Sequence, residues 1–181
     1  MPLPARIALL GLGIMGEALG ERLLETGFAL NVWNRTAQKA QALGARGAKI
    51  AVRPGGAAHD ADVVALCLTD KQAVEAVLFG DGGVAAKLSR HTLILDFSTL
   101  GIAATKDFAA RIAQISSCEW VDAPVSGGPS AARTGTLAIF CGGTQNAIAR
   151  ATPVLDAVSR VHTHMGAVGA GQATKLCNQL I

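Results

Sequence analysis

The chain has 181 residues, half of them hydrophobic and 16% charged, and its mean hydropathy is positive. This composition supports a sizeable core and excludes a chain that stays disordered. The formal net charge is +3, but the basic residues stand singly, so no cluster indicates a nucleic-acid surface. A mildly basic balance instead suits an anionic small substrate and cofactor.

Short apolar runs alternate with helical stretches along the chain, which predicts a doubly wound, mostly parallel α/β sheet with helices on both faces. The expected strands are 6–10, 29–33, 49–51, 63–68, 93–96, 119–122, 137–141 and 161–164. The expected helices are 14–26, 36–43, 55–60, 71–78, 103–115, 144–158 with a break at Pro153, and a last one from 171 onward. No apolar run reaches the length of a membrane span. The first one is short and interrupted by glycines, so it is interpreted as a strand rather than a secretory signal.

Cysteines and histidines give little indication of a metal site. The four cysteines are far apart and form no C-x-x-C pair, which favours reduced thiols in a cytoplasmic protein over disulfide or metal use. His162 and His164 share one face of an expected strand and form a conceivable metal pair. No third ligand lies nearby in sequence, so ordinary polar positions are favoured and no metal is expected.

A glycine-rich turn connects the first expected strand to the first expected helix, and it reads Gly11-Leu12-Gly13-Ile14-Met15-Gly16. In this context G-x-G-x-x-G predicts a Rossmann-type dinucleotide site. Gly11 would allow the tight turn, Gly13 the approach of a pyrophosphate, and Gly16 close packing of helix on strand. The helix then presents its free N–H groups to the phosphates.

The end of the second expected strand indicates which dinucleotide binds. An Asp or Glu for the ribose 2′-hydroxyl is expected there, but the chain has Asn34-Arg35-Thr36. Without a carboxylate to repel a 2′-phosphate, and with a guanidinium to bind it, NADP(H) is the better fit. NAD stays open as an alternative, because Arg can also stack on an adenine.

Two further segments carry polar chemistry. Ser126-Gly127-Gly128 follows a strand end, where its hydroxyl and open N–H groups could cradle a carboxylate; a tight turn that needs positive φ is the alternative. Lys175 and Asn178 share one face of the last expected helix. A lysine desolvated in an apolar turn would suit proton transfer, whereas the alternative is an ordinary surface lysine. Asp96 and Asp122 end strands and are expected to cap turns.

These motifs together resemble the β-hydroxyacid dehydrogenase family, which includes 3-hydroxyisobutyrate dehydrogenase, tartronate semialdehyde reductase, glyoxylate/succinic semialdehyde reductase and, more distantly, 6-phosphogluconate dehydrogenase. The resemblance rests on segments 11–16, 33–36, 67–70, 96–99, 122–128 and 166–178 and covers essentially the whole chain.

The resemblance implies a role for each matching residue. Lys175 would be the catalytic acid/base during hydride transfer, and Asn178 would orient the substrate beside it. The remaining roles are a substrate-carboxylate site at Ser126, Gly127 and Gly128, a cofactor groove lined by Leu68, Thr69 and Thr99, and a 2′-phosphate site at Arg35 with Asn34 and Thr36.

The resemblance also implies how the chain is organised. Residues 1–165 would form the NADP-binding domain and 166–181 the start of an interdomain helix, whose pattern stops at Ile181 without a capping signal. The family continues into an all-helical domain that closes the cleft and builds a homo-oligomer, so we expect a fragment without that domain.

The expected function is NADP(H)-dependent hydride transfer on a small β-hydroxyacid or semialdehyde acid. The alternatives are an NAD-dependent 3-hydroxyisobutyrate dehydrogenase or, for the fragment, a non-catalytic dinucleotide-binding module. Lys175 argues against imine reduction, because relatives that reduce imines tend to lack it. The departure at Gly20, inside a helix, predicts close packing of that helix on a neighbour.

Overall fold

Residues 5–179 of the computed structural model contain a nine-stranded sheet that is mostly parallel, which confirms the expected fold class. The strands run β3-β2-β1-β4-β5-β6-β8-β7, and β9 pairs with β8. All pairs from β3 to β6 are parallel, β8 is antiparallel to β6 and β7, and β9 is parallel to β8. The bounds are β1 (Arg6–Leu10), β2 (Ala29–Trp33), β3 (Lys49–Ile50), β4 (Val63–Leu66), β5 (Leu93–Asp96), β6 (Glu119–Asp122), β7 (Val125–Ser126), β8 (Leu137–Gly142) and β9 (Ser159–Gly166).

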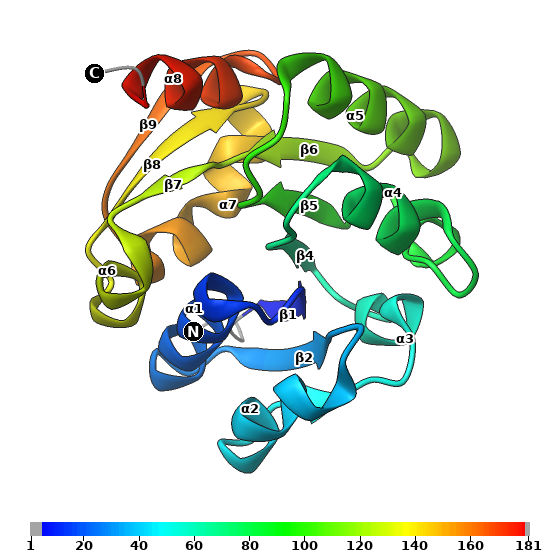
Figure 1. Cartoon of the computed structure of the whole chain (residues 1–181). Helices are drawn as coiled ribbons and strands as arrows, with labels where there is room; N and C mark the ends of the chain where they lie inside the picture. Colours follow the sequence, from blue (N-terminus) through cyan, green and yellow to red (C-terminus); the bar gives the residue numbers. More distant parts are fainter. Residues whose placement is uncertain (1–4, 180–181) are drawn as a thin grey trace.

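Helices cover both faces of the sheet, as Figure 1 shows. The α-helices are α1 (Ile14–Glu25), α2 (Gln41–Ala45), α3 (Pro54–Ala58), α4 (Lys71–Phe79), α5 (Ile102–Ser116), α6 (Gly128–Thr134), α7 (Gln145–Val158) and α8 (Ala170–Asn178). Two short 3₁₀ helices are η1 (Ala37–Ala40) and η2 (Ala85–Lys87). One core cluster packs α1, α2, α6 and α7 on one face, and the other packs α3, α4 and α5 on the opposite face. Strands β4 and β5 are buried along their whole length because they lie between these two layers.

Several expected boundaries are wrong. The helix expected at 36–43 is split into η1 and α2, and the strand expected at 63–68 ends at Leu66, so Leu68 lies in the following turn. The segment after β6 forms β7 and α6, and neither element was expected. Its glycine and proline residues indicate a loop when only local sequence is considered. The last helix is α8, and residues 180–181 lie outside the described residues.

Helix α7 runs unbroken through Pro153, contrary to the expected break. The missing N–H of a proline removes one backbone hydrogen bond from the helix interior. Buried Val154, Leu155 and Val158 nevertheless hold the last turn on the sheet, and packing outweighs the local preference. Among residues 5–179 no helix is both long and apolar enough to cross a membrane.

Candidate active site

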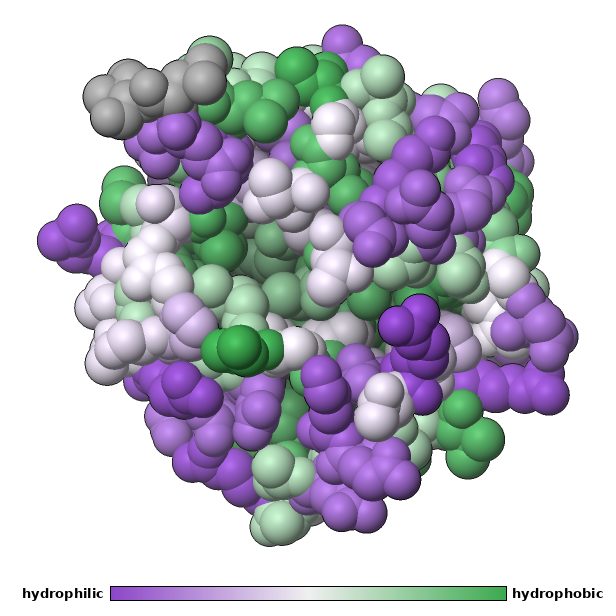
Figure 2. Space-filling model, viewed as in Figure 1, coloured by the Kyte–Doolittle hydropathy of each residue, from purple (hydrophilic) through white to green (hydrophobic). Residues whose placement is uncertain are grey.

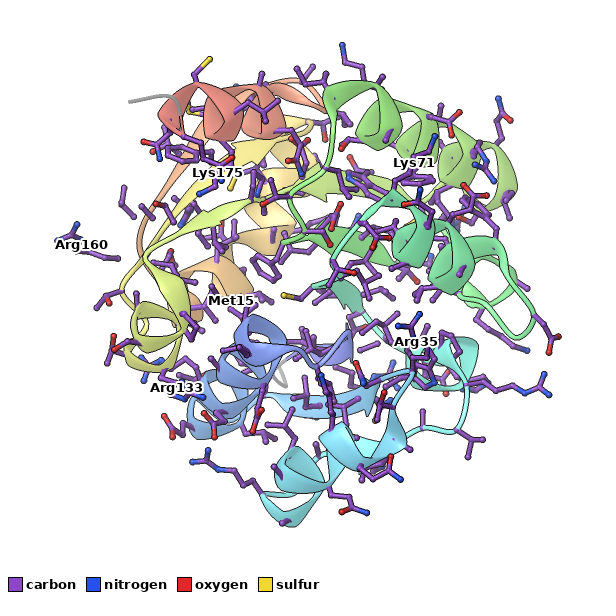
Figure 3. The ribbon with its side chains drawn as sticks, in the orientation of Figure 1. Met15, Arg35, Lys71, Arg133, Arg160 and Lys175 are labelled. Atoms are coloured by element: carbon purple, nitrogen blue, oxygen red, sulfur yellow. The ribbon has the colours of Figure 1, made fainter. Side chains whose placement is uncertain are left out.

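The expected site segments gather at the carboxyl edge of the sheet. The glycine turn follows β1, Asn34-Arg35-Thr36 follows β2, and Leu68 and Thr69 follow β4. Figure 2 shows a hollow in this face of the molecule, and Figure 3 places Met15 on α1 and Lys175 on α8 at opposite sides of it. In open α/β sheets ligands bind at this edge.

The three glycines of the turn differ in what surrounds them. Gly11 has φ of 97°, and a Cβ there would overlap the carbonyl oxygen of Cys67. A Cβ on Gly16 would overlap the carbonyl oxygen of Gly11. At Gly13, by contrast, nothing lies within 4 Å of an added Cβ. Gly11 and Gly16 are therefore required by the chain itself, while Gly13 leaves open space beside the start of α1, which fits the approach of a pyrophosphate.

Asn34 joins this turn to the end of β2. Its Oδ1 accepts a hydrogen bond from the backbone N–H of Leu12 at 2.9 Å, and its Nδ2 donates to the carbonyl of Thr36 at 3.0 Å. Both ends of the amide are thus engaged by backbone, so Asn34 shapes the turn and leaves its neighbours Arg35 and Thr36 exposed.

Arg35 is exposed in the turn that follows β2 (Figure 3). Asp70, the N-cap of α4, accepts a hydrogen bond from Ala73 at 2.8 Å. That bond is the main cause that lowers the pKa of Asp70; the Thr69 hydroxyl also lowers it, and the Arg35 guanidinium adds a smaller electrostatic contribution. The charge of Arg35 therefore acts on Asp70, at the start of α4.

The turn after β5 lies beside the turn after β4 and contains Thr99, which is expected to line the cofactor groove. The Ser98 hydroxyl accepts a hydrogen bond from Leu68 N at 3.0 Å, which ties the turn after β4 to the turn after β5. Thr69 and Thr99 are exposed at this edge, whereas Ser98 is buried. Ser98 thus connects the two turns from a buried position, while Thr69 and Thr99 face solvent.

The segment expected to hold a carboxylate contains two consecutive glycines with positive φ. Gly127 and Gly128 have φ of 128° and 74°, and α6 begins directly at Gly128. Ser126 is half-buried at the end of β7, opposite Ala138 of β8. The tight-turn explanation therefore holds for the glycines. A Cβ on Gly127 would lie 2.8 Å from the Ala131 side chain, whereas nothing lies within 4 Å of a Cβ added to Gly128, so the open space is at Gly128.

Helix α8 brings Lys175 to the hollow. Lys175 is half-buried and Asn178 is exposed. The hollow beside α8 is open to solvent (Figure 2), so Lys175 is only partly covered by the rest of the chain.

Two buried polar residues beneath α8 form contacts that the motifs did not indicate. Asp122, at the end of β6, accepts hydrogen bonds from Gly169 N at 2.7 Å and from Gln172 N at 2.9 Å. The Gln172 side chain accepts from Leu100 N at 3.0 Å and donates to the Ser98 carbonyl at 2.8 Å. The sequence did suggest that Asp122 caps a turn, but the capped element starts 47 residues away. Nothing in the sequence singled out Gln172.

The remaining candidates do not form a site. His162 lies 3.5 Å from Asp156, and His164 Nε2 lies 2.9 Å from each of the carbonyl oxygens of Gly143 and Gly166. Within residues 5–179 no three His, Cys, Asp or Glu side chains gather as metal ligands would. A separate cavity of about 630 Å³ opens at the amino edge, beside Arg6 and Lys49, and contains none of the expected site residues.

Comparisons with known proteins agree with this geometry. A family model described as the NAD binding domain of 6-phosphogluconate dehydrogenase matches residues 6–166. An NAD-dependent L-serine dehydrogenase of Pseudomonas aeruginosa is 37% identical and matches over 96% of this chain and 58% of its own. The structure of Mycobacterium tuberculosis 3-hydroxyisobutyrate dehydrogenase with L-serine has a TM-score of 0.91 and 32% identity, over 98% of this chain and 60% of that one. Psf3 in complex with NADP⁺ and 2-OPP also has a TM-score of 0.91, with 29% identity, over 96% of this chain and 61% of that one.

This chain thus spans about three-fifths of the length of the proteins it matches. Its glycine turn, parallel sheet order and carboxyl-edge hollow are those of a dinucleotide-binding fold. Together with the family model over residues 6–166, they show that the chain belongs to the family of the NAD binding domain of 6-phosphogluconate dehydrogenase and is a nicotinamide-dinucleotide-binding domain.

Proposed function

We propose that this chain is the cofactor-binding part of an NADP(H)-dependent oxidoreductase that acts on a small β-hydroxyacid or semialdehyde acid. The observation that carries the cofactor choice is the end of β2, where the exposed Arg35 stands in place of a carboxylate. A guanidinium binds phosphate with charge-assisted, bidentate hydrogen bonds, and no Asp or Glu at this strand end repels the 2′-phosphate.

The proposed residues divide the work of the reaction between them. The nicotinamide dinucleotide supplies hydride transfer when bound. Ser126, Gly127 and Gly128 hold the substrate carboxylate through the hydroxyl and open backbone N–H groups. Lys175 takes the proton from the substrate hydroxyl during oxidation or returns it during reduction, and Asn178 orients the substrate. Positioning of two reactants beside one acid/base group is sufficient for this chemistry.

The cofactor choice is tested by measuring the dissociation constants of NADPH and NADH by fluorescence titration of the full chain. We expect NADPH to bind at least about tenfold more tightly, which corresponds to ~1.4 kcal/mol. Arg35→Asp should reverse this preference, because the new carboxylate repels the 2′-phosphate and accepts the ribose hydroxyl.

Arg160→Asp makes the same charge change on β9, where Figure 3 shows Arg160 projecting away from the hollow, and should leave the preference unchanged. Equal affinities in the unmodified chain would contradict the 2′-phosphate assignment. Tighter binding of NADH than of NADPH would favour NAD, the cofactor in the name of the Pseudomonas relative.

The role of Lys175 is tested separately in the whole protein that carries this chain, with a panel of small β-hydroxyacids and semialdehyde acids. Lys175→Ala and Lys175→Arg should each lower kcat by at least ~100-fold while the NADPH dissociation constant stays within about twofold. The arginine variant keeps the charge but cannot give up its proton, so charge alone should not restore turnover. Lys87→Ala, an exposed position at the amino edge, is the matched control. Retained turnover in Lys175→Ala would remove Lys175 from the reaction.

A further inference from the structure

Helix α8 begins on a buried carboxylate that belongs to another part of the chain. Its N-cap residue is Gly169, which has no side chain to accept the free N–H groups of the first turn. Asp122 accepts two of them instead, at 2.7 Å from Gly169 N and 2.9 Å from Gln172 N. The Asp122 carboxylate is fully buried, and the N-terminal end of a helix favours a negative charge there. The start of α8 is therefore fixed to the end of β6.

Two glycines make room for this arrangement. A Cβ on Gly142 of β8 would lie 2.5 Å from Asp122 Oδ1. A Cβ on Gly171 would overlap the Phe140 carbonyl oxygen and would lie 2.8 Å from the Asp122 carbonyl oxygen. Any larger residue at either position would push α8 off the sheet edge or displace the carboxylate, so the close approach depends on both glycines.

Gln172 fixes the helix at a second point. It is fully buried, and its amide makes hydrogen bonds with both the Leu100 N–H and the Ser98 carbonyl, in the turn after β5. That turn contains Thr99, which lines the expected cofactor groove. Residues three apart on a helix are neighbours on its surface, so Lys175 projects from nearly the same side of α8 as Gln172.

We propose that Asp122 and Gln172 are positioning residues that hold Lys175 beside the expected cofactor groove. The Asp122 carboxylate sets where α8 starts. The Gln172 amide sets the rotation of α8 and its distance from the turn that carries Thr99. The inference rests on the proposed role of Lys175. It adds that the geometry of the acid/base group is set by two hydrogen-bonded contacts beneath the helix, since hydride and proton transfer are sensitive to displacements of about 1 Å.

The test compares Asp122→Asn and Gln172→Met with Glu119→Gln in the whole protein. Glu119 lies at the opposite end of the same strand, β6, and accepts hydrogen bonds from Thr144, Asn146 and Arg150, so its variant controls for the loss of a β6 carboxylate. We expect each of the first two variants to lower kcat at least ~10-fold with the NADPH dissociation constant within about twofold. Glu119→Gln should leave kcat within about twofold.

A second measurement does not depend on turnover. Hydrogen exchange at the amides of Gly169 and Gln172 should be slow in the unmodified protein, at least ~10-fold faster in Asp122→Asn, and unchanged in Glu119→Gln. Bound NADPH should also slow acylation of the Lys175 amine by an amine-reactive reagent, and this protection should be lost in Asp122→Asn and Gln172→Met. If no hydroxyacid is turned over, the proposed reaction fails, while these two measurements still decide the placement of Lys175.

The inference is overturned if Asp122→Asn and Gln172→Met keep kcat within about twofold. It is equally overturned if their loss of kcat is matched by Glu119→Gln at the same loss of Tm, because the effect would then be one of stability. Unchanged NADPH protection of Lys175 in both variants would also overturn it.

Discussion

Two buried aspartates end neighbouring parallel strands and have very different surroundings. Asp122 accepts hydrogen bonds from the start of α8, whereas Asp96 accepts one backbone hydrogen bond, from Ser98 N at 2.9 Å, and its Oδ2 is buried without a hydrogen-bond partner. Burial raises the pKa of Asp96 to about 7, and the neighbouring Asp122 carboxylate adds to this rise. A carboxyl group placed in this way prefers to keep its proton.

Burial raises the pKa of Asp122 as well, and the larger rise at Asp96 predicts a pH dependence of stability. The pKa of Asp96 is higher in the folded chain than in the unfolded chain, so its contribution to stability is complete below pH ~4 and is lost as the pH rises to 7. The loss is on the order of a few kcal/mol, since each pKa unit corresponds to about 1.4 kcal/mol.

The measurement is the free energy of unfolding by urea at pH 5 and at pH 8. Asp96→Asn should flatten the fall between these two values and should make the chain more stable than the unmodified protein at pH 8. Asp107→Asn, at an exposed position, is the control and should keep the original slope. Parallel slopes in the Asp96 variant and the unmodified chain would show that Asp96 does not carry the effect.

At the scale of elements, the unit formed by β1, the glycine turn and α1 is shaped by close contacts. Gly16 is required because its Cβ would overlap the backbone of Gly11. Gly20 confirms the expected close packing of α1 on a neighbour, since a Cβ there would lie 2.5 Å from Leu43. Gly20 costs about 1 kcal/mol in helix propensity, and this cost is offset because the absence of a side chain lets Leu43 of α2 pack directly against α1. Gly13 has no such contact.

The same contrast predicts opposite effects of two alanine substitutions in the turn. Gly16→Ala should destabilise the chain by about 2 kcal/mol or more, because backbone must move to admit the methyl group. Gly13→Ala should leave the free energy of unfolding within about 0.5 kcal/mol, because its φ of −73° suits any residue. It should nevertheless weaken NADPH binding at least ~10-fold, since the methyl group points where the pyrophosphate would approach. Thermal unfolding and NADPH titration measure the two effects, and unaltered NADPH affinity in Gly13→Ala would contradict the placement of the pyrophosphate.

At the scale of the whole molecule, the candidate site is assembled from segments that are far apart in sequence. Both core clusters lie beneath it, and the turns after β1, β2, β4 and β5 all end at the same edge (Figure 1). A ligand that contacts several of these turns should therefore stabilise the whole domain rather than one element.

Thermal shifts by cofactor fragments measure this coupling. At about 100 times its dissociation constant, 2′-phospho-ADP-ribose should raise stability by ~2.7 kcal/mol, which is roughly 5–10 °C in Tm for a chain of this size. ADP-ribose at the same concentration should produce a smaller shift, because Arg35 gains no phosphate to bind. In Arg35→Asp the order of the two fragments should reverse, and identical shifts in the unmodified chain would place the 2′-phosphate away from the β2 end.

The sequence by itself determined the fold class and the cofactor class of this protein. Short apolar runs that alternate with helical stretches predict strands buried on both faces, and therefore a mostly parallel sheet. The glycine turn predicts a dinucleotide site because its backbone geometry is local to six residues. The roles of Arg35, Lys175 and Ser126 are predictions, because each depends on a bound ligand.

Tertiary structure decided the features whose causes lie far apart in the chain. Helix α7 passes through Pro153 because its last turn packs on the sheet, and β7 forms because β8 offers it a partner. Asp122 accepts a hydrogen bond from Gly169, 47 residues later in the chain, at the start of α8. Gln172 accepts one from Leu100, 72 residues earlier, in the turn after β5. No local pattern encodes such contacts, since they depend on which strand ends the folded sheet brings together.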